Sequence, residues 1–375
     1  SKMKKTIYTY FFSEFIRYFI IVIFALAAIT WTIQAVNLLD LVTDDGHAFG
    51  IYFLYSSLTI VKIITKLFPF SFLIAILLTI SKDNELIILW TSGLNKIHIV
   101  NLVFRISLML MIIQLMLSSF INPTSLNYGR SLVKNSQLQF IPSLLIEKQF
   151  NDTVKGLTIF VDERKENGDY KNIFIRDDGK ILTKISNGAS TIFAKSGYVS
   201  EDDKNLILIN GNIQRSESDG TINIITFEKT SINLSGLSTK TISDPKIQEI
   251  STYEIISCMS LQFLKKDTSN CRYGENYTDT KIEINKRLGM PFYIPLIALV
   301  CCFLLSTRRD KKISNYNKYI YFSISFIILV ISEISVRYSG LSWAHTAFYY
   351  IIPIMLIPIF YLLLIRTFKY ENLEF

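Results

Sequence analysis

The stretch "SKDNELIILWTSGLNKIHI" (residues 81–99) separates two long apolar runs and decides how the rest of the sequence is interpreted. A plain loop of this length would be polar, yet this one contains five consecutive apolar residues, LIILW, directly after Glu85. Acidic residues are favoured in the first turn of a helix, and glycine, here Gly93, is favoured just past its end. The stretch therefore predicts a short helix over residues 84–92 between two membrane spans.

Six apolar runs of about twenty residues are long enough to cross a bilayer. Half of the 375 residues are hydrophobic, which is too apolar for an ordinary soluble protein. We expect an α-helical integral membrane protein with six transmembrane helices and an inserted all-β domain. The runs are 15–38, 56–80, 99–121, 288–305, 319–338 and 346–365. The expected parts are 1–122 (spans one to three), 123–282 (β domain plus helical linker) and 283–375 (spans four to six).

The distribution of charge predicts the orientation in the membrane. Residues 123–282 are neutral overall, so the remainder carries the whole net charge of +8. Lys and Arg precede span one and follow spans four and six, whereas the loops after spans one and five contain neither. Because cytoplasmic loops are enriched in these residues, both termini are expected in the cytoplasm and the β domain outside it. A signal peptide ending near Ala27 is the alternative, but the apolar run continues to Leu39, which favours a retained first span. The basic residues flank spans and do not form a soluble basic face, so no nucleic-acid partner is expected.

Residues 123–282, the polar stretch between the third and fourth predicted spans, are typical of a β domain. Short β-branched runs separated by turn pairs such as Asn167-Gly168 are typical of a sandwich, a jelly roll or an open barrel, and we expect a jelly-roll-like fold. Ser251 and Glu254 form a capping box that predicts a helix over 252–266. The predicted strands are 156–163, 171–177, 179–185, 190–197, 205–211 and 221–229.

The predicted strands are more apolar than a solvent-facing sheet would tolerate, because both alternate sets of side chains contain apolar residues. We therefore hypothesise that lipid acyl chains bind the inner face of the sheet. The residues expected to bind them include Phe160, Phe174, Phe193 and Leu208.

The sequence contains no signature of catalysis. It has no G-x-x-x-x-G-K-[S/T] nucleotide loop and no Cys/His cluster, so we expect no catalytic residue, no metal and no cofactor. The spacing of Cys258 and Cys271 permits a disulfide but does not require one. Cys301 and Cys302 lie in span four and are expected to be packing residues.

A charge inside a membrane span is costly and suggests a function, and three of the basic residues inside the predicted spans are candidates for binding a ligand. Lys62 and Lys66 in span two are four residues apart and therefore lie on one helical face. Together with Arg337 in span five, they are expected near the outer headgroup level, where they could hold phosphate groups. The alternative is that they snorkel to ordinary lipid headgroups, with a local Glu333–Arg337 pair.

Two interpretations of the helix at 84–92 stay open. Because it is apolar nearly all round, it must be covered by protein, either by the chain's own spans or by a cytoplasmic partner. In the second interpretation Glu85 faces a basic residue of the partner. The residues expected to couple the chain to that partner are Glu85, Leu86, Leu89, Trp90 and Gly93.

The order of these features resembles the lipopolysaccharide export permeases (the LptF/LptG, or YjgP/YjgQ, family) along nearly the whole chain. "NELIILWTSGLN" is similar to the family's Glu-Leu-x-x-x-x-x-x-Gly segment, although Trp90 stands where a smaller residue is usual. "INPTSLNYGR" resembles the proline-containing exit of its third span. "KIEINKRLGMPFYIPL" resembles the Glu-x-x-x-Arg start of its fourth span, through Glu283 and Arg287. "EKQFNDTVKGLTIFVDE" resembles the LptF-type member more than its LptG-type paralogue.

The resemblance implies a permease subunit of an ABC exporter in the bacterial inner membrane. Such a subunit would extract lipopolysaccharide and pass it to a periplasmic β-domain bridge protein toward the outer membrane. Its partners would be a second homologous six-span permease and a cytoplasmic ATPase dimer, with 84–92 as the coupling helix. One alternative is a membrane-anchored periplasmic scaffold or sensor without transport activity, which would not need the covered helix. The other is a lipid-modifying enzyme, which would need an acid/base or metal cluster that the sequence lacks.

Overall fold

The computed structural model describes most of the chain and divides it into two compact units, which we describe separately. The helical unit comprises residues 1–32, 58–127 and 246–375, and the sheet unit comprises 33–57 and 128–245. The described residues are 2–43, 48–91, 93–135, 144–152, 154, 156–165, 168–178, 189–200, 205–216, 221–233, 246–263, 277–306 and 311–371.

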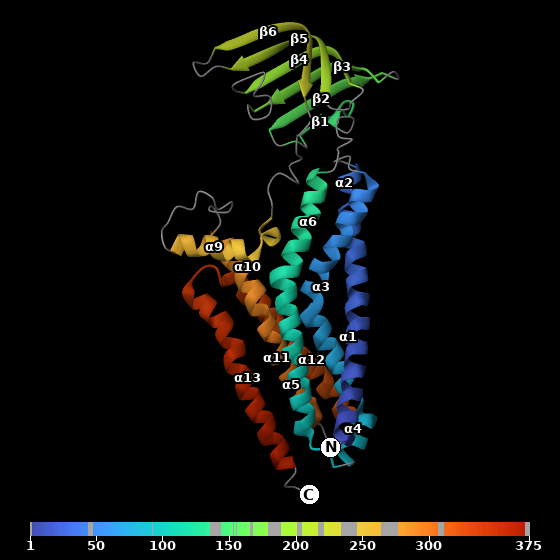
Figure 1. Cartoon of the computed structure of the whole chain (residues 1–375), viewed down its shortest axis with the longest axis vertical. Coiled ribbons are helices and arrows are strands. Elements are labelled where there is room, and N and C mark those ends of the chain that lie inside the picture. The colour runs from blue at the N-terminus through green and yellow to red at the C-terminus, as the bar shows by residue number, and fades with distance from the viewer. Residues whose placement is uncertain are drawn as a thin grey trace. The chain divides into compact units, whose positions relative to one another are not determined.

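Figure 1 labels the elements in chain order. The α-helices are α1 (Lys2–Asn37), α2 (Asp40–Thr43), α3 (Phe49–Ile80), α4 (Asp83–Thr91), α5 (Lys96–Met116), α6 (Asn122–Asn135), α9 (Thr252–Phe263), α10 (Tyr277–Gly289), α11 (Tyr293–Cys302), α12 (Lys311–Tyr338) and α13 (Trp343–Glu371). A π-helical segment covers Leu117–Ile121, and 3-10 turns cover Ile247–Glu249, Met290–Phe292 and Phe303–Ser306.

Six helical segments are long and apolar enough to cross a membrane, which confirms the predicted span count. The fourth begins at Tyr277, eleven residues before the apolar run that predicted it. The reason is that α10 is polar in sequence but buries Ile284 and Arg287 against its neighbours. The six segments are 5–43, 49–80, 96–134, 277–306, 316–338 and 343–370.

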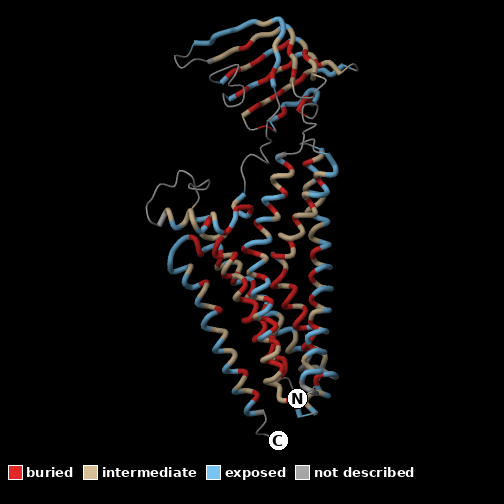
Figure 2. Tube along the Cα trace, viewed as in Figure 1, coloured by how far each residue is buried: buried red, intermediate tan, exposed pale blue. Residues whose placement is uncertain are grey.

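The core of the helical unit forms around α11. All ten residues of this helix, YIPLIALVCC, are buried, and it packs against α5, α12 and α13. Of the most apolar window in each span, 78% is buried for 277–306 but only 17% for 5–43 and for 343–370. Figure 2 shows the same contrast: red, buried positions lie in the middle of the helical unit and pale blue ones along α1 and α13. Spans one and six therefore present apolar surface outward.

The sheet unit contains one antiparallel sheet whose strands follow chain order, β1-β2-β3-β4-β5-β6. Its presence confirms the inserted all-β domain. The described strands form an up-and-down meander, a simpler order than the paired Greek keys that define a jelly roll. The predicted strand 179–185 lies outside the described residues. The strands are β1 (Phe150–Asn151), β2 (Leu157–Arg164), β3 (Tyr170–Asp177), β4 (Ser190–Val199), β5 (Asn205–Ser216) and β6 (Ile222–Asn233).

One set of apolar side chains from the strands forms a core of its own. Side chains alternate across a strand, and Ile159, Ile175 and Ile192, which pair across β2, β3 and β4, are each about 1% exposed. Leu144 and Leu145 from the segment before β1 close over this core. The residues of this core are separate from those of the helical core.

Candidate functional site

The short helix predicted between spans two and three is α4, Asp83–Thr91. Gly93 follows it with a φ of +80°, a left-handed conformation that glycine adopts without steric cost. The amide of Gly93 donates to the carbonyl of Trp90 at 3.1 Å, and that of Leu94 donates to the carbonyl of Leu89 at 3.3 Å. This turn ends α4 and leads into α5, as the position of the glycine predicted.

The two apolar faces of α4 have different surroundings. Leu86 is 8% exposed in the helical core, and Leu89 and Trp90 pack against that core. Ile87 and Ile88 are 49% and 67% exposed. The inner face of α4 is thus occupied by the chain's own spans, and the exposed apolar face is formed by Ile87 and Ile88. Docking of α4 on a cytoplasmic partner through Leu86, Leu89 and Trp90 stays a prediction.

Glu85 is held by two groups of its own chain. The Tyr10 hydroxyl on α1 donates to Glu85 Oε2 at 2.8 Å. Lys82 Nζ donates to Glu14 Oε2 at 2.7 Å and lies 3.5 Å from Glu85 Oε1. The hydrogen bond to Glu14 raises the pKa of Lys82 above its ordinary value, so Lys82 is charged at neutral pH. These four side chains, which we call the α1–α4 latch (Tyr10, Glu14, Lys82 and Glu85), tie the short helix to span one.

A cavity of about 60 Å³ lies beside the latch. Ile7 and Phe11 from α1 and Leu86 and Leu89 from α4 give it apolar walls, and Thr79 at the end of α3 joins them. A mostly apolar gap at this junction means that the apolar packing between the two helices is incomplete there. The latch is therefore the polar connection between two elements whose apolar packing is incomplete.

The cations predicted inside spans have separate environments. Lys62 is partly buried on α3, whereas Lys66 on α3 and Arg337 on α12 are exposed. The alternative Glu333–Arg337 pair is not formed: Glu333 instead accepts from Lys286 Nζ at 3.0 Å, because α10 packs against α12.

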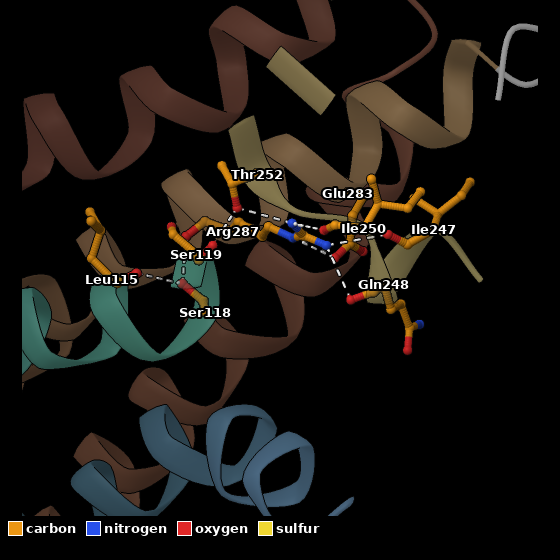
Figure 3. A network of polar contacts seen from close by, with 9 residues as sticks. All are labelled: Leu115, Ser118, Ser119, Ile247, Gln248, Ile250, Thr252, Glu283 and Arg287. Carbon is orange, nitrogen blue, oxygen red and sulfur yellow. Dashed lines mark hydrogen bonds and ion pairs between the residues drawn. The ribbon is translucent and has the colours of Figure 1, made fainter. Parts of the chain in front are cut away.

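A buried arginine on α10 organises a network of polar contacts with the residues before α9 (Figure 3). Arg287 is 3% exposed, and its Nε donates to Glu283 Oε1 at 2.8 Å. One terminal nitrogen donates to the Ile250 carbonyl at 2.8 Å and to Thr252 Oγ1 at 3.0 Å. The other donates to the carbonyls of Ile247 and Gln248 at 3.3 and 3.2 Å. The resemblance marked Glu283 and Arg287, but nothing in the sequence placed residues 247–252 around them.

The same network reaches the π-helical segment of span three. Pro123 has no N–H, so the carbonyls about one turn before it lack a helical donor. The Ser119 carbonyl instead accepts from the Thr252 hydroxyl, and Ser118 Oγ donates to the Arg287 carbonyl at 2.8 Å. We call the group Ser118, Ser119, Thr252, Glu283 and Arg287 the Arg287 node. It joins spans three and four to the start of α9.

The residues expected to bind acyl chains do not share one environment. Phe160, Phe174 and Phe193 pair across β2, β3 and β4, and Phe150 extends the row. Their ring centroids are 4.6 Å (Phe150–Phe160) and 5.2 Å (Phe174–Phe193) apart, with Phe150 63% and Phe193 40% exposed. Leu208, in contrast, is fully buried in the sheet core.

Leu208 differs from the phenylalanines because the alternation of buried and exposed side chains changes phase within β3 and β5. Asn172 and Asn210 have positive φ, 47° and 52°, so the regular alternation of side chains is interrupted there. In β5 the buried positions change from 206 and 208 to 213, and in β3 from 170 to 173 and 175. The phenylalanine row (Phe150, Phe160, Phe174 and Phe193) is therefore a partly exposed apolar surface that is separate from the sheet core.

The described cysteines and His345 are bonded or packed within the protein. Cys258 on α9 is disulfide-bonded, and Cys271, its predicted partner, lies outside the described residues. Cys301 and Cys302 are free thiols buried in α11. His345 Nδ1 lies 2.6 Å from Ser342 Oγ at the start of α13. Within the described ranges, no three His, Cys, Asp or Glu side chains are grouped to hold a metal ion.

Comparison with known proteins adds two findings. A model of the family described as "Lipopolysaccharide export system permease LptF/LptG" matches residues 9–367, nearly the whole chain. The uncharacterized protein RP871 of Rickettsia prowazekii (strain Madrid E) is 29% identical over 240 residues. That alignment covers 62% of this chain and 64% of the relative.

Proposed function

The chain belongs to the lipopolysaccharide export system permease family LptF/LptG, and from that premise we propose that it is a permease subunit of an ABC exporter in the bacterial inner membrane. Its substrate is lipopolysaccharide, which it extracts and passes to a periplasmic β-domain bridge protein. Its partners are a second homologous six-span permease and a cytoplasmic ATPase dimer. The α4 helix is the observation that carries this proposal most directly.

The α4 helix is the coupling helix in this proposal. A nine-residue helix held to span one by the latch still exposes two consecutive isoleucines, Ile87 and Ile88. Apolar side chains on a short helix are suited to a groove on a partner protein. The inner residues Leu86, Leu89 and Trp90 then serve to transmit motion from the ATPase into the spans, and Gly93 fixes the turn into span three.

The orientation of the chain in the membrane follows from the assignment of α4 as the coupling helix. With α4 and both termini in the cytoplasm, Lys62 and Lys66 lie in the outer half of span two and the sheet unit is periplasmic. Lysines at that depth are suited to the phosphate groups of a lipid in the outer leaflet. Arg337 on α12 is a further candidate of the same kind. The phenylalanine row is the proposed path for acyl chains, and the sequence resemblance favours the LptF-type subunit.

Purification of the native complex tests this function. The chain, solubilised gently from its own membranes, should bring down a small P-loop ATPase and a second six-span chain, and extracted lipid should contain lipopolysaccharide. In proteoliposomes the complex should release lipopolysaccharide only with ATP and the bridge protein. Recovery of the chain alone, with ordinary phospholipid, would favour the membrane-anchored scaffold or sensor. The matched control is an Ile87→Ser, Ile88→Ser variant, which should insert normally but lose the ATPase.

A further inference from the structure

Prolines interrupt four of the six spans, and in each of these spans one proline deprives a backbone carbonyl of its usual donor. Proline has no N–H to donate to the carbonyl four residues before it. Pro69 lies inside α3 and Pro353 inside α13. Pro123 lies at the start of α6 in span three, and Pro291 lies in the 3-10 turn between α10 and α11 in span four. The four carbonyls concerned are those of Thr65, Ser119, Arg287 and Tyr349.

Span three compensates for the proline of span two. Gln114 of α5 donates from its Nε2 to the Thr65 carbonyl at 2.9 Å. The glutamine is 3% exposed, and within the described residues its Oε1 has no hydrogen-bond partner. Because Thr65 precedes Pro69 by four residues, the buried glutamine replaces the N–H that the proline lacks.

Span four compensates for the proline of span six in the same way. The Tyr293 hydroxyl on α11 donates to the Tyr349 carbonyl at 2.7 Å, and both tyrosines are fully buried. Their ring centroids are 5.5 Å apart. A Cβ at Gly289 would collide with the Tyr349 ring, so spans four and six approach closely where Pro291 and Pro353 interrupt them.

The Arg287 node contains the other two compensating bonds. Ser118 Oγ of span three donates at 2.8 Å to the Arg287 carbonyl, which lies four residues before the proline of span four. The Thr252 hydroxyl donates to the Ser119 carbonyl, which lies four residues before the proline of span three. Three of the four bonds thus connect spans two, three, four and six in that order, and the fourth ties span three to the start of α9. All four lie within the helical unit.

A proline inside a span has two physical consequences. The helix can bend there without breaking a backbone hydrogen bond, because that bond is already missing. The freed carbonyl, however, is costly when it is left without a donor inside a protein or a membrane. The donor on the neighbouring span therefore follows the carbonyl when the helix bends, so that a bend in one span is passed to the next.

We propose that Pro69, Pro123, Pro291 and Pro353, which we call the linked prolines, are hinges that bend together during export, and that the side-chain donors are positioning residues that couple their bends. The inference rests on the proposed export function for its power source and its cargo. Helix α4 joins spans two and three in sequence, so a displacement of α4 by the ATPase acts on the first two members of the series. The four donors are Gln114, Ser118, Thr252 and Tyr293.

Tyr293→Phe in the assembled exporter tests the bond between spans four and six, because it removes one hydroxyl and retains the ring. We expect lipid released per ATP to fall about fivefold, the factor that corresponds to one neutral hydrogen bond. The midpoint of thermal unfolding should fall by about 3 °C. Tyr361→Phe is the matched control, since Tyr361 bonds span six to span three at 2.8 Å but donates to a side chain, Asn101, and not to a freed carbonyl. It should lower the midpoint similarly and leave release unchanged, and equal release in the two variants would overturn the proposal.

A second substitution separates a hinge from a bond that only stabilises the spans. Pro353→Ala supplies the missing N–H to the Tyr349 carbonyl, so its addition to Tyr293→Phe should restore the midpoint of unfolding, whereas release should stay low because the hinge is gone. Recovery of release together with the midpoint would assign the bond a purely structural role. Failure to restore the midpoint would show that the tyrosine does not compensate for the proline. Gln114→Leu with and without Pro69→Ala should give the same pattern, and recovery of release in that pair would equally contradict the hinge.

Pro358→Ala is the control for the proline substitutions. Pro358 lies in the same helix as Pro353, but in the part of the chain that the structure describes no side chain donates to the Ile354 carbonyl four residues before it. Pro358→Ala should therefore leave release unchanged, whereas Pro353→Ala alone should lower it. Equal effects of the two substitutions would show that the linked prolines have no role of their own.

Spin labels at Phe348 and Leu362, two exposed positions on either side of Pro353, report the bend of span six directly. The distance between the labels should change between the nucleotide-free and the ATP-bound exporter. This change should be lost in Tyr293→Phe and retained in Tyr361→Phe. A distance that does not respond to nucleotide would overturn the hinge. A distance that responds in an exporter that releases no lipopolysaccharide would refute the proposed cargo and leave the hinges standing.

Discussion

At the scale of single residues, the α1–α4 latch attaches the proposed coupling helix to span one through polar contacts. Tyr10 and Glu14 are one turn apart on α1 and contact Glu85 and Lys82, respectively. The contacts are polar and directional, whereas the apolar junction beside them contains a cavity of about 60 Å³. Motion of α4 would therefore be transmitted to span one through these bonds as well as through the packing of Leu86, Leu89 and Trp90.

Tyr10→Phe tests this transmission, because it removes one hydroxyl and no charge. We expect ATP hydrolysis to continue in the assembled exporter while lipid released per ATP falls several-fold, since a hydrogen bond to a charged group contributes about 1.5–3 kcal/mol. The measurement is the ratio of released lipid to hydrolysed ATP in proteoliposomes. Tyr316→Phe, at an exposed position on α12, is the control. An unchanged ratio in Tyr10→Phe would show that Glu85 acts only toward the partner.

The pKa of Lys82 gives a second expectation at this scale. The hydrogen bond to Glu14 raises that pKa, so the stabilisation is fully present below the unfolded pKa, about 10.4 for lysine. It is lost only as the pH rises through the still higher folded value. Coupling of hydrolysis to release should therefore stay constant from about pH 7 to pH 9. Lys82→Met should lower it at every pH, and a decline within that range in the unsubstituted protein would contradict the latch.

Sequence reasoning identified the residues of the coupling helix but not their roles. Glu85 and Gly93 were recognisable because acidic starts and glycine ends follow from local helix chemistry. Tyr10 and Glu14 were not recognisable, because they contact residues that are 75 and 68 positions away in the sequence. A local sequence pattern carries no information about contacts between such distant residues. The orientation of Leu86 inward and Ile88 outward was equally hidden, since a helix that is apolar all round has no periodicity from which to infer its buried face.

At the scale of elements, regular patterns predicted well and irregular backbone did not. Six apolar runs gave six spans, and five of the six proposed strand runs coincide with described strands. The π-helical segment and the left-handed Asn172 and Asn210 have no hydropathy signal, although each changes which side chains meet. The Ser119 carbonyl in the π-helical segment, to which Pro123 has no N–H to donate, accepts from the Thr252 hydroxyl, and the asparagines separate Leu208 from the phenylalanine row.

The phenylalanine row predicts that this face of the sheet contacts lipid during export. Photo-crosslinkers introduced at Phe160, Phe174 and Phe193 should capture lipid during export, because these rings form an apolar surface that remains partly exposed. A crosslinker at Leu208 should capture little, since that position is fully buried. Gly168, at a turn, gives the background. The measurement is lipid-labelled protein on a gel, with and without ATP, and equal labelling at Phe193 and Gly168 would refute a lipid path on this face.

At the scale of the molecule, the chain consists of two units with separate cores. The helical core gathers residues from all six spans around α11, and the sheet core draws only on residues between 144 and 232. The six strands lie in sequence between spans three and four, yet the Arg287 node lies wholly among residues of the helical unit. Folding of the spans should therefore not depend on the sheet, even though export would depend on both.

Replacement of residues 136–245 by a flexible Gly/Ser linker of about twenty residues tests this independence. The shortened chain should insert, retain the ATPase and hydrolyse ATP, because α4, the latch and the helical core are all preserved. It should still bind lipopolysaccharide, since Lys62 and Lys66, the lysines proposed for its phosphate groups, remain. Release of lipid to the bridge protein should be lost, because the phenylalanine row is absent. The measurements are co-purified ATPase, bound lipid and released lipid on one preparation. A shortened chain that inserts but fails to bind the ATPase would show that the sheet unit stabilises the coupling helix, and the two units would then have to be treated as one folding unit.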